Sequence, residues 1–213
     1  MARNPTGDQA AILGNVADRS PHNRRRMSAI ALFIALLALA AGAGYLVGRS
    51  QDGIRPVARD TGFVVDMLDH HQQAVELAEF AQAQTTNDVV RSLALSIISD
   101  QRWEIGWMEA WLADRGVPRP NGSRTAMAWM DMPVPSDQMP GLIPSEEVID
   151  FYNQTGDNLD RTFLELMLRH HEGGVHMAQY AAQHAADPAL REFASRIVVK
   201  QRNEMNDITQ LLG

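Results

Sequence analysis

The sequence predicts an all-α protein: a four-helix bundle built from two copies of a helical hairpin and preceded by one transmembrane helix. Two observations support this prediction. A block of sequence recurs at an offset of one hundred residues, and its apolar positions follow the spacing of an amphipathic helix. A long run near the N-terminus carries no charged side chain. No segment shows the alternation of apolar and polar residues that indicates a strand.

The repeat keeps the same spacing through two blocks of sequence. In the first block the matched pairs are Phe63 and Phe163, Met67 and Met167, Leu68 and Leu168, His70 and His170, His71 and His171, Val75 and Val175, and Ala78 and Ala178. In the second block they are Arg91 and Arg191, Ala94 and Ala194, Ile97 and Ile197, Gln101 and Gln201, and Glu104 and Glu204. Each copy therefore carries two adjacent histidines in its first helix and a glutamate in its second.

The N-terminal segment divides into a polar tail and an apolar run. Residues 1–26 are polar and end in three arginines, which predicts a disordered cytoplasmic tail. Residues 27–48 carry no charge, and a helix of that length, at about 1.5 Å per residue, spans roughly 30 Å of hydrocarbon. The basic residues before this run place the N-terminus in the cytoplasm and the rest of the chain outside the cell membrane.

Two other interpretations of residues 27–48 stay open. The run could be a buried helix of a soluble protein, although so long an uncharged stretch is unusual there. It could also belong to a cleaved signal peptide, because Ala41-Gly42-Ala43 has the form of a cleavage site, and the domain would then be secreted. We expect an uncleaved anchor, because the apolar run is longer than the core of a usual signal peptide.

The bundle is predicted to cover residues 60–213. Residues 49–59 contain a glycine and a proline and predict a short linker, after which Asp60 or Thr61 caps the first helix. The matching helix of the second copy is expected to begin at about Asp160.

Two hairpins make up this bundle, at residues 60–113 and 146–213. Asn87 and Asp88 are the expected caps inside the first hairpin, and Asp187 marks the break inside the second. Residues 114–145 are rich in proline and methionine and predict a long crossover loop, followed by a short helix. Two hairpins joined by one long crossover have the connectivity of a ferritin-like bundle.

Composition excludes several classes of function. The net charge of −7 argues against general binding to nucleic acid. The chain has no cysteine, which excludes disulfides, thiolate metal sites and cysteine nucleophiles. No glycine-rich phosphate loop, serine triad or paired acid–base dyad is present in the sequence, so we expect no catalysis.

A helical wheel places metal-binding side chains on the core-facing stripe of the helices. The first histidine of each copy points inward beside a thioether, and the second lies at the edge of the stripe. The glutamate of each copy shares an inward face with a glutamine. The predicted metal ligands are Met67, His70, His71, Glu104, Met108, Met167, His170, His171, Met177 and Glu204.

This ligand set indicates which metal to expect. Imidazole and thioether ligands favour Cu(I), with Ag(I) or Cu(II) as alternatives. A di-iron centre is disfavoured, because only one glutamate per copy faces inward and neither has a histidine three residues on. Met127, Met130, Met132 and Met139 lie in the polar, proline-rich crossover, so we expect them to help capture the ion rather than fill a core.

The residues alone leave three functions open. The first is sequestration or handover of metal ions without catalysis. The second is a structural or interaction module without metal, in which the histidines pair with Glu104 and Glu204. The third is a redox enzyme that uses a bound metal.

The motifs also resemble a known family. Each copy contains Phe-x3-Met-x2-His-His, and the first continues with Gln-x2-Glu-Ile-x2-Met-x2-Trp-Leu. This order over residues 60–213 resembles the bacterial "domain of unknown function 305" family. The resemblance implies a ferritin-like helical bundle, export from the cytoplasm, and a relation to periplasmic copper-binding proteins linked to copper tolerance. The chain departs from the family pattern at Leu77, Leu142 and Ile208, where methionine is expected.

We predict that the anchor stays in the mature protein. N-terminal sequencing of the membrane-extracted chain should read the original N-terminus or the residues directly after its first methionine. A mature chain that begins near Gly44 would show instead that residues 27–43 belong to a cleaved signal peptide.

Overall fold

The computed structural model describes the backbone of residues 21–213 and the side chains of residues 34–40, 42 and 58–213. The chain forms two compact units, Met1–Gln51 and Asp52–Gly213. Helix α1, Pro21–Gln84, contributes to both. The described chain is mostly helical, as the sequence predicts.

The first unit contains the N-terminal part of α1. Its described side chains include Ile34, Leu36, Leu37 and Leu39, each more than half exposed. Within the part of the chain that the structure describes, no helix combines the length and the apolar character needed to cross a membrane. Residues 1–20 and most side chains of the expected anchor lie outside the described residues, so the anchor remains a prediction.

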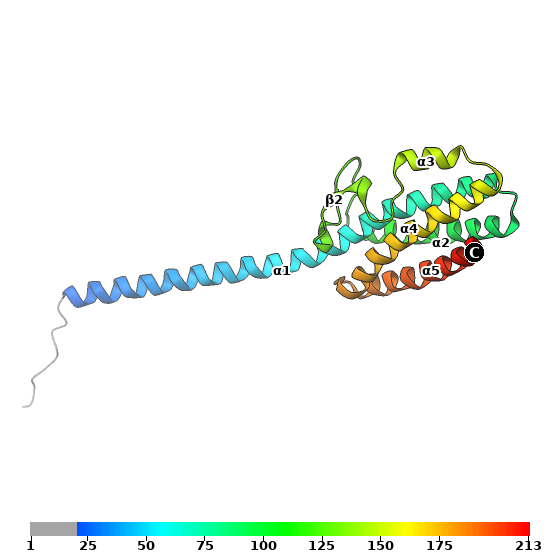
Figure 1. Ribbon diagram of the computed structural model, residues 1–213. Helices are drawn as coiled ribbons and strands as arrows, with labels where there is room; N and C mark the ends of the chain where they lie inside the picture. The colour runs from blue at the N-terminus through cyan, green and yellow to red at the C-terminus, as the bar shows by residue number, and fades with distance from the viewer. Residues whose placement is uncertain (1–20) are drawn as a thin grey trace, which may run out of the picture. The chain divides into compact units, whose positions relative to one another are not determined.

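Four helical segments lie side by side in the second unit (Figure 1). They are the C-terminal part of α1, α2 (Asp88–Asp114), α4 (Gly156–His184) and α5 (Pro188–Leu212). The short α3 (Ser145–Tyr152) is anchored by Phe151, whose ring packs near those of Phe80 in α1 and Phe163 in α4. It therefore covers the groove between α1 and α4.

The crossover from α2 to α3 is more ordered than the sequence predicts. Strands β1 (Thr125–Ala126) and β2 (Val134–Pro135) pair antiparallel, with Thr125 opposite Pro135. Two short 3-10 helices, η1 (Ala128–Met130) and η2 (Ser136–Gln138), complete it. The expectation that no strand forms is wrong, because strands of two residues are too short to show an alternating pattern.

Two clusters of buried apolar side chains form the core. The first cluster includes Met67 of α1, Trp111 of α2, Ala178 of α4 and Phe193 of α5. The second cluster includes Leu77 of α1, Val90 of α2, Phe163 of α4 and Ile208 of α5. The early part of one helix thus lies level with the late part of its neighbour, so α1 runs antiparallel to α4, and α2 to α5.

Local signals located several helix ends correctly. The side chain of Asn87 caps α2 by accepting hydrogen bonds from the backbone N–H groups of Val89 and Val90. Asp187 caps α5 in the same way. The predicted start of the third long helix is wrong by one turn, because α4 begins at Gly156, which has the positive φ of 56° that glycine tolerates.

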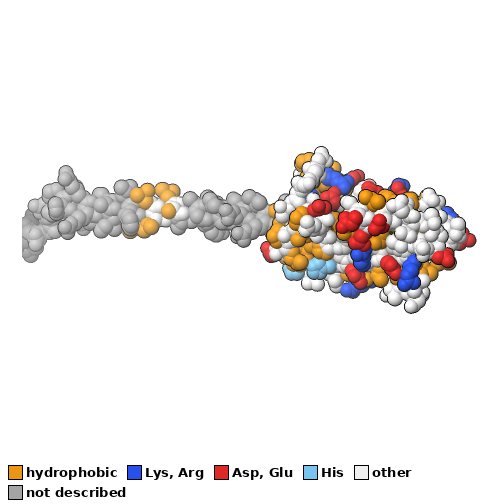
Figure 2. Space-filling model, turned by 45° about the horizontal axis from the view of Figure 1, so that its top comes forward, with side chains coloured by type: hydrophobic (Ala, Val, Ile, Leu, Met, Phe, Trp, Pro, Cys, Tyr) orange, Lys and Arg blue, Asp and Glu red, His pale blue; other side chains and the backbone are white. Residues whose placement is uncertain are grey.

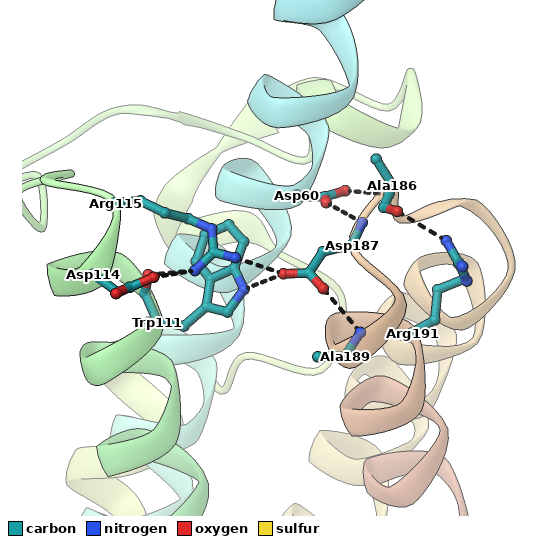
Figure 3. Close-up of polar contacts among 8 residues, drawn as sticks. All are labelled: Asp60, Trp111, Asp114, Arg115, Ala186, Asp187, Ala189 and Arg191. Carbon is teal, nitrogen blue, oxygen red and sulfur yellow. Dashed lines mark hydrogen bonds and ion pairs between the residues drawn. The ribbon is translucent and has the colours of Figure 1, made fainter.

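The predicted linker at residues 49–59 and the helix start at Asp60 are also wrong, because α1 runs through them. Asp60 is a capping residue, but it acts on a different helix end. Its carboxylate accepts hydrogen bonds of 2.8 Å from the backbone N–H groups of Ala186 and Asp187, in the turn between α4 and α5 (Figure 3).

Asp187 extends this corner to α2 (Figure 3). Its Oδ2 accepts hydrogen bonds from the Trp111 indole at 2.9 Å and from Arg115 at 2.7 Å. Burial alone would raise the pKa of Asp187, but the hydrogen bonds from Trp111 and Ala189 and the charge of Arg115 outweigh it and lower that pKa. The corner therefore joins three of the four helical segments.

We predict that Asp60→Ala lowers the free energy of unfolding by about 1–3 kcal/mol, because two backbone N–H groups lose their acceptor. Chemical denaturation of the full chain measures the change. Asp160→Ala is the matched control at the same position of the repeat, where the carboxylate is buried and its Oδ1 has no hydrogen-bond partner among the described residues. Equal losses in the two variants would contradict this role of Asp60.

Candidate metal centre

Two histidine side chains meet at the centre of the second unit. His70 comes from α1 and His170 from α4; both are fully buried, and their ring centroids lie 3.8 Å apart. Both point inward, as the helical wheel predicts. Because α1 and α4 are antiparallel, the two copies of the repeat bring the same residue to this contact from opposite sides.

A backbone segment of the crossover covers this histidine pair. Residues 139–143, which we call the strap, pass over His70, whose Nε2 lies 3.2 Å from the carbonyl oxygen of Pro140. The next residue has to be glycine. A Cβ on Gly141 would lie 2.6 Å from the carbonyl oxygen of His170 and 2.9 Å from Nε2 of His70, and its φ of 87° also favours glycine.

The strap lies between α1 and α4 and contacts both. On α1, the amide of Gln73 donates to the carbonyl of Ile143 at 2.9 Å and accepts from its N–H at 2.7 Å. On α4, Gly173 leaves room for the strap, since a Cβ there would overlap the carbonyl group of Pro140. The strap is therefore hydrogen-bonded to α1, and α4 leaves space for it.

The second histidine of each copy is paired with a carboxylate. Nε2 of His71 lies 2.8 Å from Oε2 of Glu104, and Nε2 of His171 lies 2.6 Å from Oε2 of Glu204. Both histidines are fully buried rather than at the edge of the stripe, because each faces the second helix of its own hairpin. A carboxylate accepts hydrogen bonds, so Nε2 of each histidine donates to its glutamate.

This centre holds more buried polar atoms than its protein contacts satisfy. Among the described residues, no hydrogen-bond partner is found for Nδ1 of His70, His71 and His171, for both ring nitrogens of His170, for the amides of Gln101 and Gln201, or for Oε1 of Glu204. Buried polar atoms are nearly always paired with protein, water or a bound ion. This concentration of unpaired atoms marks the centre as a candidate binding site.

Burial keeps the histidine pair uncharged. Removal from water, and next the neighbouring His71 and His171, lower the pKa of His70 from 6.5 to about 3. Desolvation, and next the adjacent His70, lower the pKa of His170 well below its ordinary value. Neutral imidazole is the form that binds metal, so these rings are ready to act as ligands at neutral pH.

Six methionines gather in the first cluster. They are Met67, Met108 and Met177 of the helices and Met127, Met130 and Met139 of the crossover. The expectation that the crossover methionines have no core to fill is therefore wrong for these three, which are at most 5% exposed, whereas Met132 is 46% exposed. They are buried because the crossover folds back over this end of the helices. Met167 lies in the second cluster.

A model of the family "Domain of unknown function (DUF305)" matches residues 60–212. The chain belongs to this family. A DUF305 protein from Streptomyces coelicolor, 32% identical, superposes with a TM-score of 0.67 over 72% of this chain and 91% of that one. CopM in its Cu(I)-bound form, 25% identical, superposes with a TM-score of 0.57 over 71% of this chain and 94% of that one.

Similarity to a curated relative is more limited. Uncharacterized protein L153 of Acanthamoeba polyphaga mimivirus is 28% identical over 53 residues, which are 25% of this chain and 35% of that protein. The chain thus matches about a third of that relative's length. The DUF305 assignment rests on the family match and on the solved structures.

Two of the three departures from the DUF305 pattern lie in the second cluster, whereas Leu142 packs against the first. Leu77 and Ile208 replace expected methionines, and both lie in the second cluster. The matching residues, Met177 and Met108, lie in the first cluster beside Met67. The antiparallel helices therefore bring Met177 of the second copy level with Met67 of the first, whereas Met167 lies in the other cluster.

By themselves, the acidic and imidazole side chains do not form a complete metal site. No group of three or more His, Asp or Glu side chains within the described residues is arranged to hold an ion. Glu104 and Glu204, both predicted as ligands, each use one oxygen on a histidine. A metal at the histidine pair would therefore need ligands of another kind, and the thioethers of the first cluster are candidates.

The sequence analysis missed the residues that shape the space around the pair. The strap and the adjacent glycines of α4 were not singled out, although two glycines in mid-helix are a signal of close packing. Gly173 faces Pro140, and a Cβ on Gly174 would overlap the side-chain amide of Gln201. The two glycines thus let α4 approach the strap and α5 closely.

We predict that the buried histidines destabilise the fold in acid. In the unfolded chain His70 is protonated below about pH 6.5, but in the folded protein only below about pH 3. Protons therefore bind the unfolded state preferentially between these values, and the free energy of unfolding decreases as the pH falls. Each such histidine contributes a slope of about 1.4 kcal/mol per pH unit. Denaturation with a chelator present at pH 6.0, 5.25 and 4.5 should show a smaller slope for His70→Gln than for the wild type.

The control for this experiment is His184→Gln, on the same helix as His170 but exposed. Its slope should equal that of the wild type, because the His184 side chain lies at the surface and not in the buried centre. A slope that His70→Gln leaves unchanged would mean that His70 can be protonated inside the folded protein.

Proposed function

We propose that this DUF305 protein binds a soft monovalent metal ion, Cu(I) or Ag(I), at the histidine pair and the adjacent methionines, and that it sequesters the ion or hands it over. The observation that carries the proposal is the contact of two fully buried, uncharged imidazoles, three of whose four ring nitrogens lack a hydrogen-bond partner among the described residues. The proposed scaffold is a ferritin-like bundle made of duplicated hairpins.

The hydrogen bonds at the centre indicate which atoms would bind the ion. The carbonyl of Pro140 can only accept, so Nε2 of His70 donates to it, and Nδ1 keeps its lone pair. The carboxylates of Glu104 and Glu204 accept from Nε2 of His71 and His171, and Nδ1 of each ring has no partner among the described residues. Metal-binding histidines are commonly oriented by such a hydrogen bond on the other ring nitrogen.

The surroundings of the pair favour a soft, singly charged ion. Thioether sulfurs are soft, neutral ligands that select Cu(I) over harder cations. The first cluster offers six of them, among them Met139 within the strap and Met67 one helical turn before His70. A ligand set of neutral imidazoles and thioethers adds no negative charge, which suits a monovalent ion in a buried site.

A related protein supports this choice. CopM has been solved in Cu(I)-bound, Cu(II)-bound and Ag-bound forms. Its similarity to the present chain extends over most of the second unit, where the histidine pair lies.

A structural module without metal is the second candidate. It is favoured by the two His–Glu pairs, which would hold each hairpin together whether or not an ion binds. It leaves the contact of His70 with His170 unexplained, since neither ring reaches a carboxylate in any hydrogen bond of the described residues. The two functions are separable by substituting the two kinds of histidine separately.

We further propose that binding takes place outside the cytoplasm, with the chain anchored in the cell membrane by residues 27–48. The support for this location is the charge-free run and the arginines before it.

We predict that His70→Leu combined with His170→Leu abolishes Cu(I) and Ag(I) binding by the full chain, while the protein stays folded. Competition titration against a Cu(I) chelator measures the affinity, and circular dichroism checks the fold. His184→Leu is the control and should bind like the wild type. The wild type should still bind at pH 5, because the pKa of His70 lies near 3.

The companion variant is His71→Leu with His171→Leu. It leaves Glu104 and Glu204 buried without their partners, so we expect a loss of stability of about 1–3 kcal/mol per pair, with a weakened metal affinity. Full metal binding by the His70/His170 variant would refute the proposed centre. No metal binding by the wild type would favour the structural module.

A further inference from the structure

We propose that a surface depression over the strap is the port through which the ion reaches and leaves the histidine pair, and that the strap is its gate. The nature of the ion rests on the proposed function. That the histidine pair is enclosed does not rest on the proposed function, because this follows from the burial of His70 and His170 and from their contacts with the strap.

The histidine pair is closed off from solvent. His70 and His170 have no exposed surface, so a ligand can reach them only if something moves. Two sides are formed by α1 and α4 themselves, and α2 and α5 present Glu104 and Glu204 to the neighbouring histidines. Towards the groove between α1 and α4, the cover is a single stretch of backbone, Pro140 and Gly141.

The outer side of this stretch lines a depression of about 410 Å³. Its wall is formed by the strap and by Glu172, Gly173 and His176 of α4. Pro140 and Gly141 thus contact His70 on one side and line open space on the other. One thickness of backbone separates the pair from the depression.

The contacts of the strap allow it to open without unfolding of the helices. It has no regular secondary structure. Met139 and Ile143 at its two ends are buried in the core clusters, and Gln73 makes two hydrogen bonds with Ile143. Pro140 and Gly141 between these ends are only partly buried, and Pro140 accepts a hydrogen bond from His70. The crossover is firmly fixed before the strap, where buried Asp66 accepts hydrogen bonds of 2.7 Å from the Met127 N–H and from the Trp129 indole.

The lining of the depression suits an arriving cation. Glu172 and His176 lie one helical turn apart on the outer face of α4, and both are exposed. They present a carboxylate and an imidazole at the mouth of the port. Arg169 of α4 also lines the depression, and its charge is paired with Glu147 of α3.

The first test measures access to the pair without metal. Diethyl pyrocarbonate modifies exposed neutral imidazoles, and peptide mass spectrometry of the full chain gives the rate at each histidine. Gln73→Leu removes both hydrogen bonds to Ile143, and Gly173→Ala displaces Pro140. Each variant should speed modification of His70 and His170 by about tenfold or more, as the loss of one or two hydrogen bonds predicts.

Each variant has a matched control. Gln72→Leu alters the neighbouring glutamine, which bonds only to Glu76 in the described part of the chain. Gly106→Ala adds the same methyl group to a helical glycine with no atom within 4 Å of its Cβ. Both should behave like the wild type. The exposed His176 and His184 are internal standards; Figure 2 shows histidine at the surface as one small patch.

The second test follows the ion itself. Silver-loaded full chain is mixed with excess chelator, and both variants should release Ag(I) faster than their controls by a similar factor. Because a gate acts on entering and leaving alike, the equilibrium affinity should change much less than the rates.

The outcomes separate the gate from the proposed function. Unchanged modification of His70 and His170 in both Gln73→Leu and Gly173→Ala would overturn the strap as a gate. Faster modification with faster Ag(I) release supports it. Faster modification in a protein that binds neither Ag(I) nor Cu(I) would retain the strap as the cover of the pair and refute the metal-binding function.

Discussion

The contact between the rings of His70 and His170 constrains the residues around it. A charge on either ring would be costly, because both are fully buried and each lies next to another imidazole. The low pKa of His70 expresses this constraint. A neutral ring still has one donor and one acceptor, and Pro140 uses only the donor of His70. The lone pair on Nδ1 of His70 has no partner among the described residues and is available to a ligand.

The two copies of the repeat differ where they touch the strap. One strap serves both copies, so α1 and α4 cannot meet it with the same side chain. Gln73 binds the strap, and Gly173, one hundred residues on, makes room for it. The copies also differ in their methionines. Met108 and Met177 lie at the end that the crossover covers, and the corresponding residues of the other copy, Ile208 and Leu77, lie at the opposite end. The repeat therefore builds one centre between its copies.

Local sequence was enough to predict much of the fold, and non-local packing explains the rest. The cap at Asn87 and the break at Asp187 depend on hydrogen bonds within a few residues, and both predictions are confirmed. The inward direction of His70 and His170 follows from helical periodicity alone. Asp60 was misassigned because its acceptor role spans more than a hundred residues. The crossover methionines are buried because the crossover folds back over one end of the helices, and no short sequence pattern predicts such a reversal of the chain.

The unpaired polar atoms at the centre cost the folded state free energy, and this cost has to be offset by contacts elsewhere. The corner of Asp60, Trp111 and Asp187 is one such contact, and the hydrogen bonds of Asp66 are another. The crossover is thus fixed before the strap by Asp66 and after it by Phe151 of α3, which packs against α1 and α4. Between these two points the strap is held at its ends by buried Met139 and Ile143, and its middle, Pro140 and Gly141, is only partly buried. A ligand that satisfied the centre would add its binding free energy to that of the fold.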